Sequence, residues 1–267
     1  MLDDISPEAR AEVERRLSAI EADDGVRILF AVESGSRAWG FASPDSDYDC
    51  RFLYVRPLNG YLELFQPRDV IERPILDLFD VNGWDLTKAL KLIIGGNSVI
   101  QEWLASPIVY RKDAAFVDAL VPLAKDWRSA YADAHHYHGL LATQLGRHLA
   151  GRTQVNLKKY FYVIRPAIAL QWLREKGGSP PMDLPSLVAG VVVPAGVAEA
   201  LEMLREAKRR ASEVGEGQRI VALDRYIDDQ AQWGLANKGR PSSPDPALVA
   251  RTNAFFRDVV TGRKLTP

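Results

Sequence analysis

Apolar and polar positions follow two different periods along the first part of the chain. Short apolar runs at residues 26–32 and 50–55 are bounded by turn-forming residues, which is typical of buried strands. Residues 70–75 and 76–81 contain further strand material. Residues 6–22 carry apolar side chains at helical spacing behind a serine N-cap and a proline, which predicts a helix.

Helical periodicity dominates the rest of the chain. We predict helices at residues 86–94, 98–104, 114–125, 127–150, 155–177, 195–214, 217–233 and 244–260. The proline- and glycine-rich residues 177–194 are predicted to be a connector. The pattern indicates an α+β domain at residues 1–112, followed by an all-helical C-terminal domain at residues 113–267.

Composition narrows the class of protein. With 47% hydrophobic and 26% charged residues, the chain resembles a soluble globular protein. No apolar run approaches the length of a membrane span, and the N-terminus lacks the layout of a signal peptide. The only cysteine, Cys50, fits a reducing cytoplasm and is expected in the core. A net charge of −1 predicts no overall affinity for polyanions but leaves room for a local basic groove.

Two aspartates begin the second predicted strand. In a strand, residues two apart face the same side, so Asp47 and Asp49 are expected to present their carboxylates together, with Tyr48 facing the other way. Two such charges repel by roughly 4 kcal/mol at an effective dielectric constant of about 20. A shared proton, a nearby arginine or lysine, or a divalent cation such as Mg²⁺ would offset this repulsion.

A Gly35-Ser36 pair follows the first predicted strand. Glycine allows backbone N–H groups to approach an anion closely, and the serine hydroxyl can hydrogen-bond a phosphate oxygen. Arg37 could contact a phosphate or pair with the two aspartates. These residues therefore suggest a phosphate site beside the carboxylates.

The order Gly35-Ser36, ten residues, then Asp47-Tyr48-Asp49 resembles the signature of the DNA polymerase β-like nucleotidyltransferase superfamily. The finer pattern Gly-Ser-Arg-Ala-Trp-Gly-Phe and Ser-Asp-Tyr-Asp-x-Arg-Phe is similar to one bacterial and phage group, named for an RNA repair pathway (RlaP-type). Stretches beginning at Asn82 and Glu102 look like the same group. The resemblance implies a palm-like mixed sheet with flanking helices and, next to it, a helical domain that helps to hold the acceptor.

The resemblance also implies a third carboxylate on the strand after the Asp-x-Asp strand. Asp80 is favoured, with Asp77 and Asp85 as competitors. On an ideal strand Asp77 and Asp80 face opposite sides, and Asp85 is equally well placed as the N-cap of the next helix. Three carboxylates would support two Mg²⁺ or Mn²⁺ ions, which polarise the attacking hydroxyl and stabilise the leaving pyrophosphate.

Basic residues outside the motif are further candidates for contact with a nucleotide. Lys88 falls off the apolar stripe of its helix and could reach a phosphate, or lie in solvent. Lys158, Lys159 and Arg165 lie close together on a predicted helix, where they could bind the triphosphate. On the same helix Tyr160 or Tyr162 could stack on a base, and the alternative is a core helix with a solvated charged side.

Two other clusters are weaker candidates. His135 and His138 lie three residues apart on a predicted helix and could share a metal ion, but no carboxylate or cysteine completes a zinc set at good spacing. Lys208, Arg209 and Arg210 are expected to form a solvated helix face.

The function predicted from these observations is nucleotidyl transfer. A nucleoside triphosphate, with ATP expected, would transfer its nucleoside monophosphate to an acceptor hydroxyl, for which the resemblance favours RNA. The alternatives are AMPylation of a protein, a non-catalytic nucleotide- or RNA-binding module on the same fold, and a metal-dependent phosphohydrolase. The phosphohydrolase usually brings a His-Asp cluster, which the sequence around the Asp pair lacks.

Overall fold

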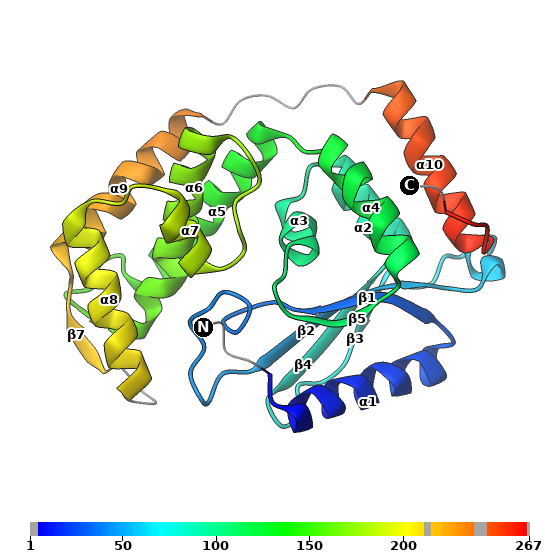
Figure 1. The fold of residues 1–267 in the computed structure, drawn as a ribbon, viewed down its shortest axis with the longest axis horizontal. Coiled ribbons are helices and arrows are strands. Elements are labelled where there is room, and N and C mark those ends of the chain that lie inside the picture. The colour runs from blue at the N-terminus through cyan, green and yellow to red at the C-terminus, as the bar shows by residue number, and fades with distance from the viewer. Residues whose placement is uncertain (1–4, 211–214, 238–244, 266–267) are drawn as a thin grey trace. The chain divides into compact units, whose positions relative to one another are not determined.

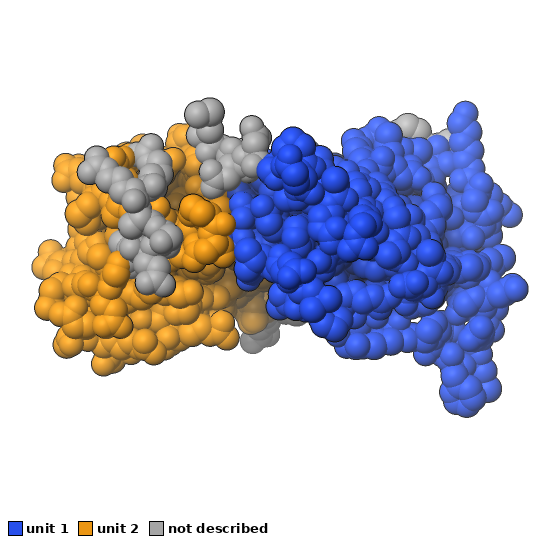
Figure 2. Space-filling view, turned by 90° about the horizontal axis from the view of Figure 1, so that it is seen from below, with its two compact units in different colours: residues 1–38, 46–128, 242–267 blue, residues 39–45, 129–241 orange. Residues whose placement is uncertain are grey.

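The computed structural model describes residues 5–210, 215–237 and 245–265. They divide into two compact units, which Figure 2 colours separately. Unit 1 comprises residues 1–38, 46–128 and 242–267, and unit 2 comprises residues 39–45 and 129–241.

Unit 1 is built on a mixed five-stranded sheet in the order β3-β4-β2-β1-β5. Its strands are β1 (Arg27–Glu33), β2 (Tyr48–Val55), β3 (Val70–Glu72), β4 (Phe79–Asp85) and β5 (Val109–Lys112). Strands β2 and β4 are parallel, and the other neighbours are antiparallel. The parallel pair lies at the centre of the motif, because it places Asp49 opposite Asp80.

Helices cover both faces of this sheet (Figure 1). Helix α1 (Pro7–Asp24) lies on one face, between an N-cap at Ser6 and a left-handed C-cap at Gly25. The opposite face is covered by α2 (Leu86–Ile94), α3 (Ser98–Leu104), α4 (Ala114–Asp126) and α10 (Pro246–Val260), and a short 3₁₀ helix, η1 (Leu58–Tyr61), follows β2. Each face therefore has its own apolar core.

Alternation along β2 decides which side chains reach which face. Cys50 and Phe52 pack in the core beneath α1, whereas Leu53 and Val55 pack under α2 to α4. Side chains alternate along a strand, so Asp49 and the intervening arginine share the face of Leu53. The polar start of β2 thus lies on the side of the sheet away from α1.

Unit 2 is predominantly helical. Its elements are α5 (Ala130–His148), β6 (Gln154–Asn156), η2 (Leu157–Lys159), α6 (Tyr160–Lys176), α7 (Leu184–Gly190), α8 (Ala195–Arg210), β7 (Glu216–Gln218) and α9 (Val221–Ala236). Helix α6 forms the centre, because most of its side chains are buried between its neighbours. Strands β6 and β7 pair as a small antiparallel ribbon.

A segment from the loop between β1 and β2 belongs to unit 2. Residues 39–45 contribute two aromatic side chains to its core. Phe41 stacks on Phe161 with ring centroids 5.3 Å apart, and Trp39 meets Tyr162 edge-on at 6.0 Å. The chain therefore leaves unit 1 and returns to it between the Gly-Ser pair and the Asp pair.

Most predicted elements of unit 1 are confirmed, and α2 and α3 have the predicted bounds. The expectation of strand material through residues 73–78 is wrong. Asp77 and Leu78 have φ angles of 51° and 69°, and Leu76 pairs with Phe79, so this stretch is a tight turn between β3 and β4. Strand β5 was not predicted, because its four residues carry no sustained apolar alternation.

Unit 2 also departs from the prediction in detail. The helix expected from residue 155 begins only at Tyr160, because β6 and η2 precede it. The connector at 177–194 contains α7, and β7 occupies the start of the helix expected at 217. Residues 211–214 of the predicted helix at 195–214 lie outside the described residues.

The partition into units is not the single boundary after residue 112 expected from the sequence. Helices α4 and α10 turn apolar side chains such as Phe116 and Phe255 into the core shared with the sheet, so both belong to unit 1. In the described part of the chain, none of the helices combines the length and apolarity that crossing a membrane requires.

Candidate active site

Asp49 lies where the Gly-Ser turn meets the sheet. Its backbone N–H donates to Oε1 of Glu33 at 2.9 Å, and its carbonyl oxygen accepts from Ser34 at 2.8 Å. A Cβ atom on Gly35 would lie 2.1 Å from Oδ2 of Asp49. The two halves of the motif are therefore in direct contact.

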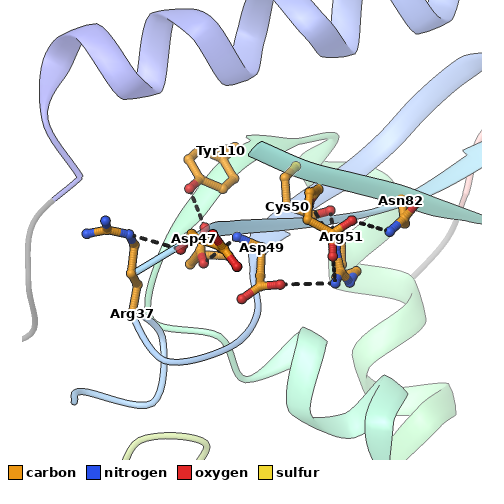
Figure 3. Close-up of polar contacts among 9 residues, drawn as sticks. Arg37, Asp47, Asp49, Cys50, Arg51, Asn82 and Tyr110 are labelled. Atoms are coloured by element: carbon orange, nitrogen blue, oxygen red, sulfur yellow. Dashed lines mark hydrogen bonds and ion pairs between the residues drawn. The ribbon is translucent and has the colours of Figure 1, made fainter. Parts of the chain in front are cut away.

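Arg51 bridges two aspartates from neighbouring strands (Figure 3). Its Nη2 lies 3.1 Å from Oδ1 of Asp49 and 2.7 Å from Oδ2 of Asp80. The Nδ2 group of Asn82 donates to the other oxygen of Asp80. Asp80 thus lies beside Asp49, as expected, but both of its carboxylate oxygens have partners within the chain.

Burial and the neighbouring charges shift the pKa of Asp49. Burial raises the pKa of Asp49 to about 6. Arg51 acts in the opposite direction and lowers this pKa, whereas the charges of Asp80 and Asp47 raise it further. The predicted repulsion among these carboxylates is therefore present, and the chain offsets part of it with an arginine.

A buried carboxyl group supports Asp49 from behind. Glu33, at the end of β1, is fully buried, and Tyr110 on β5 donates its hydroxyl to Oε2 at 2.5 Å. Burial raises the pKa of Glu33 to about 7, although the hydrogen bonds from Tyr110 and from the Asp49 backbone act to lower it. Glu33 therefore ties β5 to the strand that carries Asp49.

Arg37 holds the segment that leads into β2. Its guanidinium donates to the carbonyl oxygen of Ser46 at 2.7 Å and to that of Asp47 at 3.2 Å. It also lies over the ring of Tyr48, with its centre 4.0 Å from the ring centroid. These contacts occupy a buried side chain, so Arg37 fixes the position of Asp47 through its backbone.

Other residues of unit 1 that the sequence suggested for the site have partners outside the Gly-Ser and Asp-x-Asp motif. The side chain of Asp77 is 92% exposed, and its carboxylate lies 4.0 Å from Arg16. Asp85 accepts from the backbone of Thr87 as the N-cap of α2, which confirms that reading. The ammonium group of Lys88 lies 3.4 Å from Asp69, and within the described residues it has no ion pair with the motif aspartates.

The basic residues predicted in unit 2 separate into two groups. Arg165 is buried, donates from Nε to the carbonyl of Met182 at 2.8 Å and lies over the ring of Trp39. The expectation that it contacts a nucleotide is therefore not supported. Lys159 instead lies over the ring of Tyr162 at 4.9 Å, and Lys158 is 3.4 Å from Asp45.

The expectation that Lys208 lies on a solvated helix face is wrong. It is buried, with its ammonium group over the rings of Phe41 and Phe161 at 5.0 and 5.4 Å, and so does not belong to a solvated face. Its long stem and cationic end instead pack on the aromatic core of unit 2.

The donor set of the motif fits a divalent cation held by two carboxylates. Asp47 and Asp49 supply hard oxygen donors that repel each other, and Mg²⁺ is commonly bound by one or two carboxylates together with substrate phosphates. Across residues 5–210, 215–237 and 245–265, no group of three or more Asp, Glu, His or Cys side chains is arranged to hold a metal ion, and this includes His135 and His138. A cation held by these two carboxylates alone would need water or substrate phosphates to complete its coordination.

Sequence reasoning missed three residues of this site: Glu33, Arg51 and Tyr110. The sequence did contain a signal for Arg51, because this residue lies two positions after Asp49 and so faces the same side of β2. Glu33 is an acid at the end of an apolar strand, which is unusual enough to notice. Tyr110 had none, because only the pairing of β5 with β1 brings it to Glu33.

The chain matches a protein-family model over most of its length. The model described as "RNA repair pathway DNA polymerase beta family" matches residues 9–258. The chain belongs to this family. The family and the mixed α+β architecture indicate a polymerase β-like nucleotidyltransferase, which confirms the predicted resemblance and fold class.

Two known proteins align with most of the chain. The uncharacterized protein YcgL of Bacillus subtilis (strain 168) is 41% identical over 216 residues, which cover 81% of this chain and 83% of that protein. A nucleotidyltransferase-like protein from Exiguobacterium sibiricum 255-15, solved as a crystal structure, is 13% identical and aligns with a TM-score of 0.31, over 93% of this chain and 90% of that one.

Proposed function

We propose that this protein is a metal-dependent nucleotidyltransferase that moves a nucleoside monophosphate from a triphosphate, with ATP expected, to a hydroxyl group of RNA. The acceptor oxygen attacks the α-phosphorus, the bond to the bridging oxygen breaks, and pyrophosphate leaves. The hydroxyl proton is released to solvent. The observation that carries the proposal is the contact of the Gly35 backbone with the carboxylate of Asp49.

The residues of the motif divide this chemistry between them. Asp47 and Asp49 would hold a Mg²⁺ or Mn²⁺ ion, which neutralises phosphate charge and activates the acceptor hydroxyl. The turn at Gly35 and Ser36 would bind phosphate oxygens through its backbone N–H groups. Arg37 keeps Asp47 in place, and Asp80 pairs with Arg51 beside Asp49. Lys88 remains a candidate for phosphate contact that would have to leave Asp69.

A basic cluster in unit 2 supports an RNA acceptor. Burial lowers the pKa of His148, and the positive charges of Lys159, Arg147 and Arg152 lower it further. In the described part of the chain none of the three cations forms an ion pair, although exposed arginines and lysines elsewhere in the protein do. Unpaired cations grouped in this way favour a polyanionic backbone.

The experiment that tests the proposal follows the label of a radioactive triphosphate. The protein is incubated with each α-³²P-labelled triphosphate, Mg²⁺ or Mn²⁺ and total cell extract, and RNA, protein and small molecules are then separated. We expect label in RNA and stoichiometric release of pyrophosphate.

Each alternative has its own outcome. Label in protein would replace RNA with a protein acceptor, that is, AMPylation. Release of inorganic phosphate without transfer would indicate a phosphohydrolase. Nucleotide binding without pyrophosphate release from any acceptor would overturn the proposal in favour of a non-catalytic module.

A further inference from the structure

One guanidinium in unit 1 lies between two carboxylates from different strands. A single atom, Nη2 of Arg51, contacts Oδ1 of Asp49 and Oδ2 of Asp80 at 3.1 and 2.7 Å (Figure 3). Nη1 donates to the carbonyl oxygens of Asp80 at 2.9 Å and of Cys50 at 3.1 Å. Four acceptors from β2 and β4 therefore hold a side chain that is only 20% exposed.

Two carboxylate oxygens that converge on one point are the arrangement expected around a divalent cation. In this protein the guanidinium of Arg51 occupies that point. Because an arginine side chain stays protonated, this charge does not depend on the concentration of metal ions. Its planar fork also suits two carboxylates better than the point charge of a lysine would.

The remaining oxygens show where a cation can still bind. Asp80 has none to spare, because Asn82 donates to its Oδ1 and Arg51 to its Oδ2. Asp49 keeps Oδ2, the oxygen that faces Gly35, free of Arg51. The free oxygen of Asp49 thus points toward the Gly-Ser turn, where the substrate phosphates are proposed to bind.

We propose that Arg51 takes the place of one of two divalent cations, so that Asp47 and Asp49 bind a single cation, whose other ligands are water or, in the complex, substrate phosphates. This inference rests on the proposed nucleotidyl transfer. It makes Asp80 the anchor of Arg51, in place of the metal ligand that the family resemblance implies. Arg51 is on this account a positioning residue and a permanent counter-charge.

The test counts bound Mn²⁺ by electron paramagnetic resonance on the full-length protein, at saturating Mn²⁺ and without nucleotide or acceptor. The wild type is expected to bind one Mn²⁺ per chain. Arg51→Gln frees the oxygens of Asp49 and Asp80 and is expected to bind two. Arg51→Lys keeps the charge and is expected to bind one.

Two further variants control the count. Arg56→Gln removes another arginine just beyond β2, one that is 18% exposed and lies 3.7 Å from Asp85, and is expected to leave the count at one. Asp80→Asn is also expected to leave it at one, because Asp80 is not a ligand in this proposal. Circular dichroism verifies that each variant is folded.

Several results would overturn the inference. These are a wild-type count other than one, an Arg51→Gln count that equals the wild type, and loss of the bound ion in Asp80→Asn. If Arg51→Gln does not fold, the Mn²⁺ counts of the wild type and of Asp80→Asn can still overturn the inference. Because no transfer is measured, a failure to find an acceptor leaves the count unaffected.

Discussion

Gly35 and Asp49 lie so close that a Cβ atom on the glycine would fall 2.1 Å from Oδ2 of the aspartate. The φ angle of Gly35 is 129°, a conformation that residues with a side chain rarely adopt. Both facts require glycine at this position. The motif is therefore one unit in space, although its two halves are ten residues apart in the sequence.

Gly35→Ala tests this relationship. We expect nucleotidyl transfer to fall at least ~100-fold and the free energy of unfolding to fall by about 1–3 kcal/mol, since the new methyl group pushes Asp49 aside. Steady-state rates and urea unfolding measure the two effects. Gly25→Ala is the control, because Gly25 also has a positive φ angle, 61°, but open space around it. It should lose stability alone, and unchanged transfer in Gly35→Ala would contradict the proposed turn.

Asp47→Asn and Asp49→Asn are expected to abolish transfer while the protein remains folded. Each replacement keeps the shape of the side chain and removes one carboxylate charge, so a loss of at least ~1,000-fold in kcat, about 4 kcal/mol of transition-state stabilisation, is expected. Pyrophosphate release measures this loss. The matched control is Asp118→Asn, an exposed aspartate paired with Lys112. Full activity in either motif variant would remove the proposed site.

Glu33→Gln is expected to change how stability depends on pH. The pKa of Glu33 is about 7 in the folded protein against an ordinary value of 4.5, so between these values the folded state holds a proton that the unfolded state has released. The wild type therefore loses stability as pH rises through this window, by roughly 3 kcal/mol at most. The glutamine variant lacks this loss, because its side chain does not titrate.

Urea unfolding at pH 4.5 and pH 8 measures the difference between the two proteins. The variant should gain on the wild type at pH 8 and not at pH 4.5. Glu63→Gln, at an exposed position, corrects for the general effect of removing a carboxylate. Parallel pH profiles for wild type and Glu33→Gln would mean that folding does not raise the pKa of Glu33.

Phe41→Ala is expected to destabilise unit 2. Phe41 is buried and stacks on Phe161, so its removal leaves a cavity that should cost about 3–5 kcal/mol. Thermal and urea unfolding of the whole chain measure this loss. Phe65→Ala is the control, because Phe65 is 85% exposed and should change stability by less than about 0.5 kcal/mol. Equal effects of the two replacements would contradict the packing of residues 39–45 in unit 2.

The basic cluster predicts a salt-dependent affinity for RNA. Replacing Arg147, Arg152 and Lys159 together by alanine should weaken binding of a single-stranded oligonucleotide and lower the slope of log affinity against log salt by about 0.7 for each cation removed from a phosphate. Fluorescence anisotropy over a range of salt concentrations gives both quantities. Arg205→Ala, which removes an arginine paired with Glu202, is the control. A slope equal to that of the wild type would exclude this cluster from RNA binding.

Local signals in the sequence were enough to predict several parts of the protein. The N-cap at Asp85 and the glycines after Ile94 set the bounds of α2, because capping and chain breaking act within a few residues. The Gly-Ser pair and the Asp-x-Asp pair were recognised in the same way. Residues 73–78 were misread, because a tight turn with positive φ at Leu78 opposes the preference of an apolar side chain for strand.

The sequence by itself determined the class of fold, the family and the two aspartates of the motif, since periodicity and motif spacing are properties of neighbouring residues. Only the tertiary structure decided that Arg51 lies between Asp49 and Asp80, that Glu33 meets Tyr110, and that Arg165 and Lys208 are buried. These relationships depend on which strands pair and on how helices pack. Such long-range choices bring together residues whose separation along the chain says nothing about their distance in space.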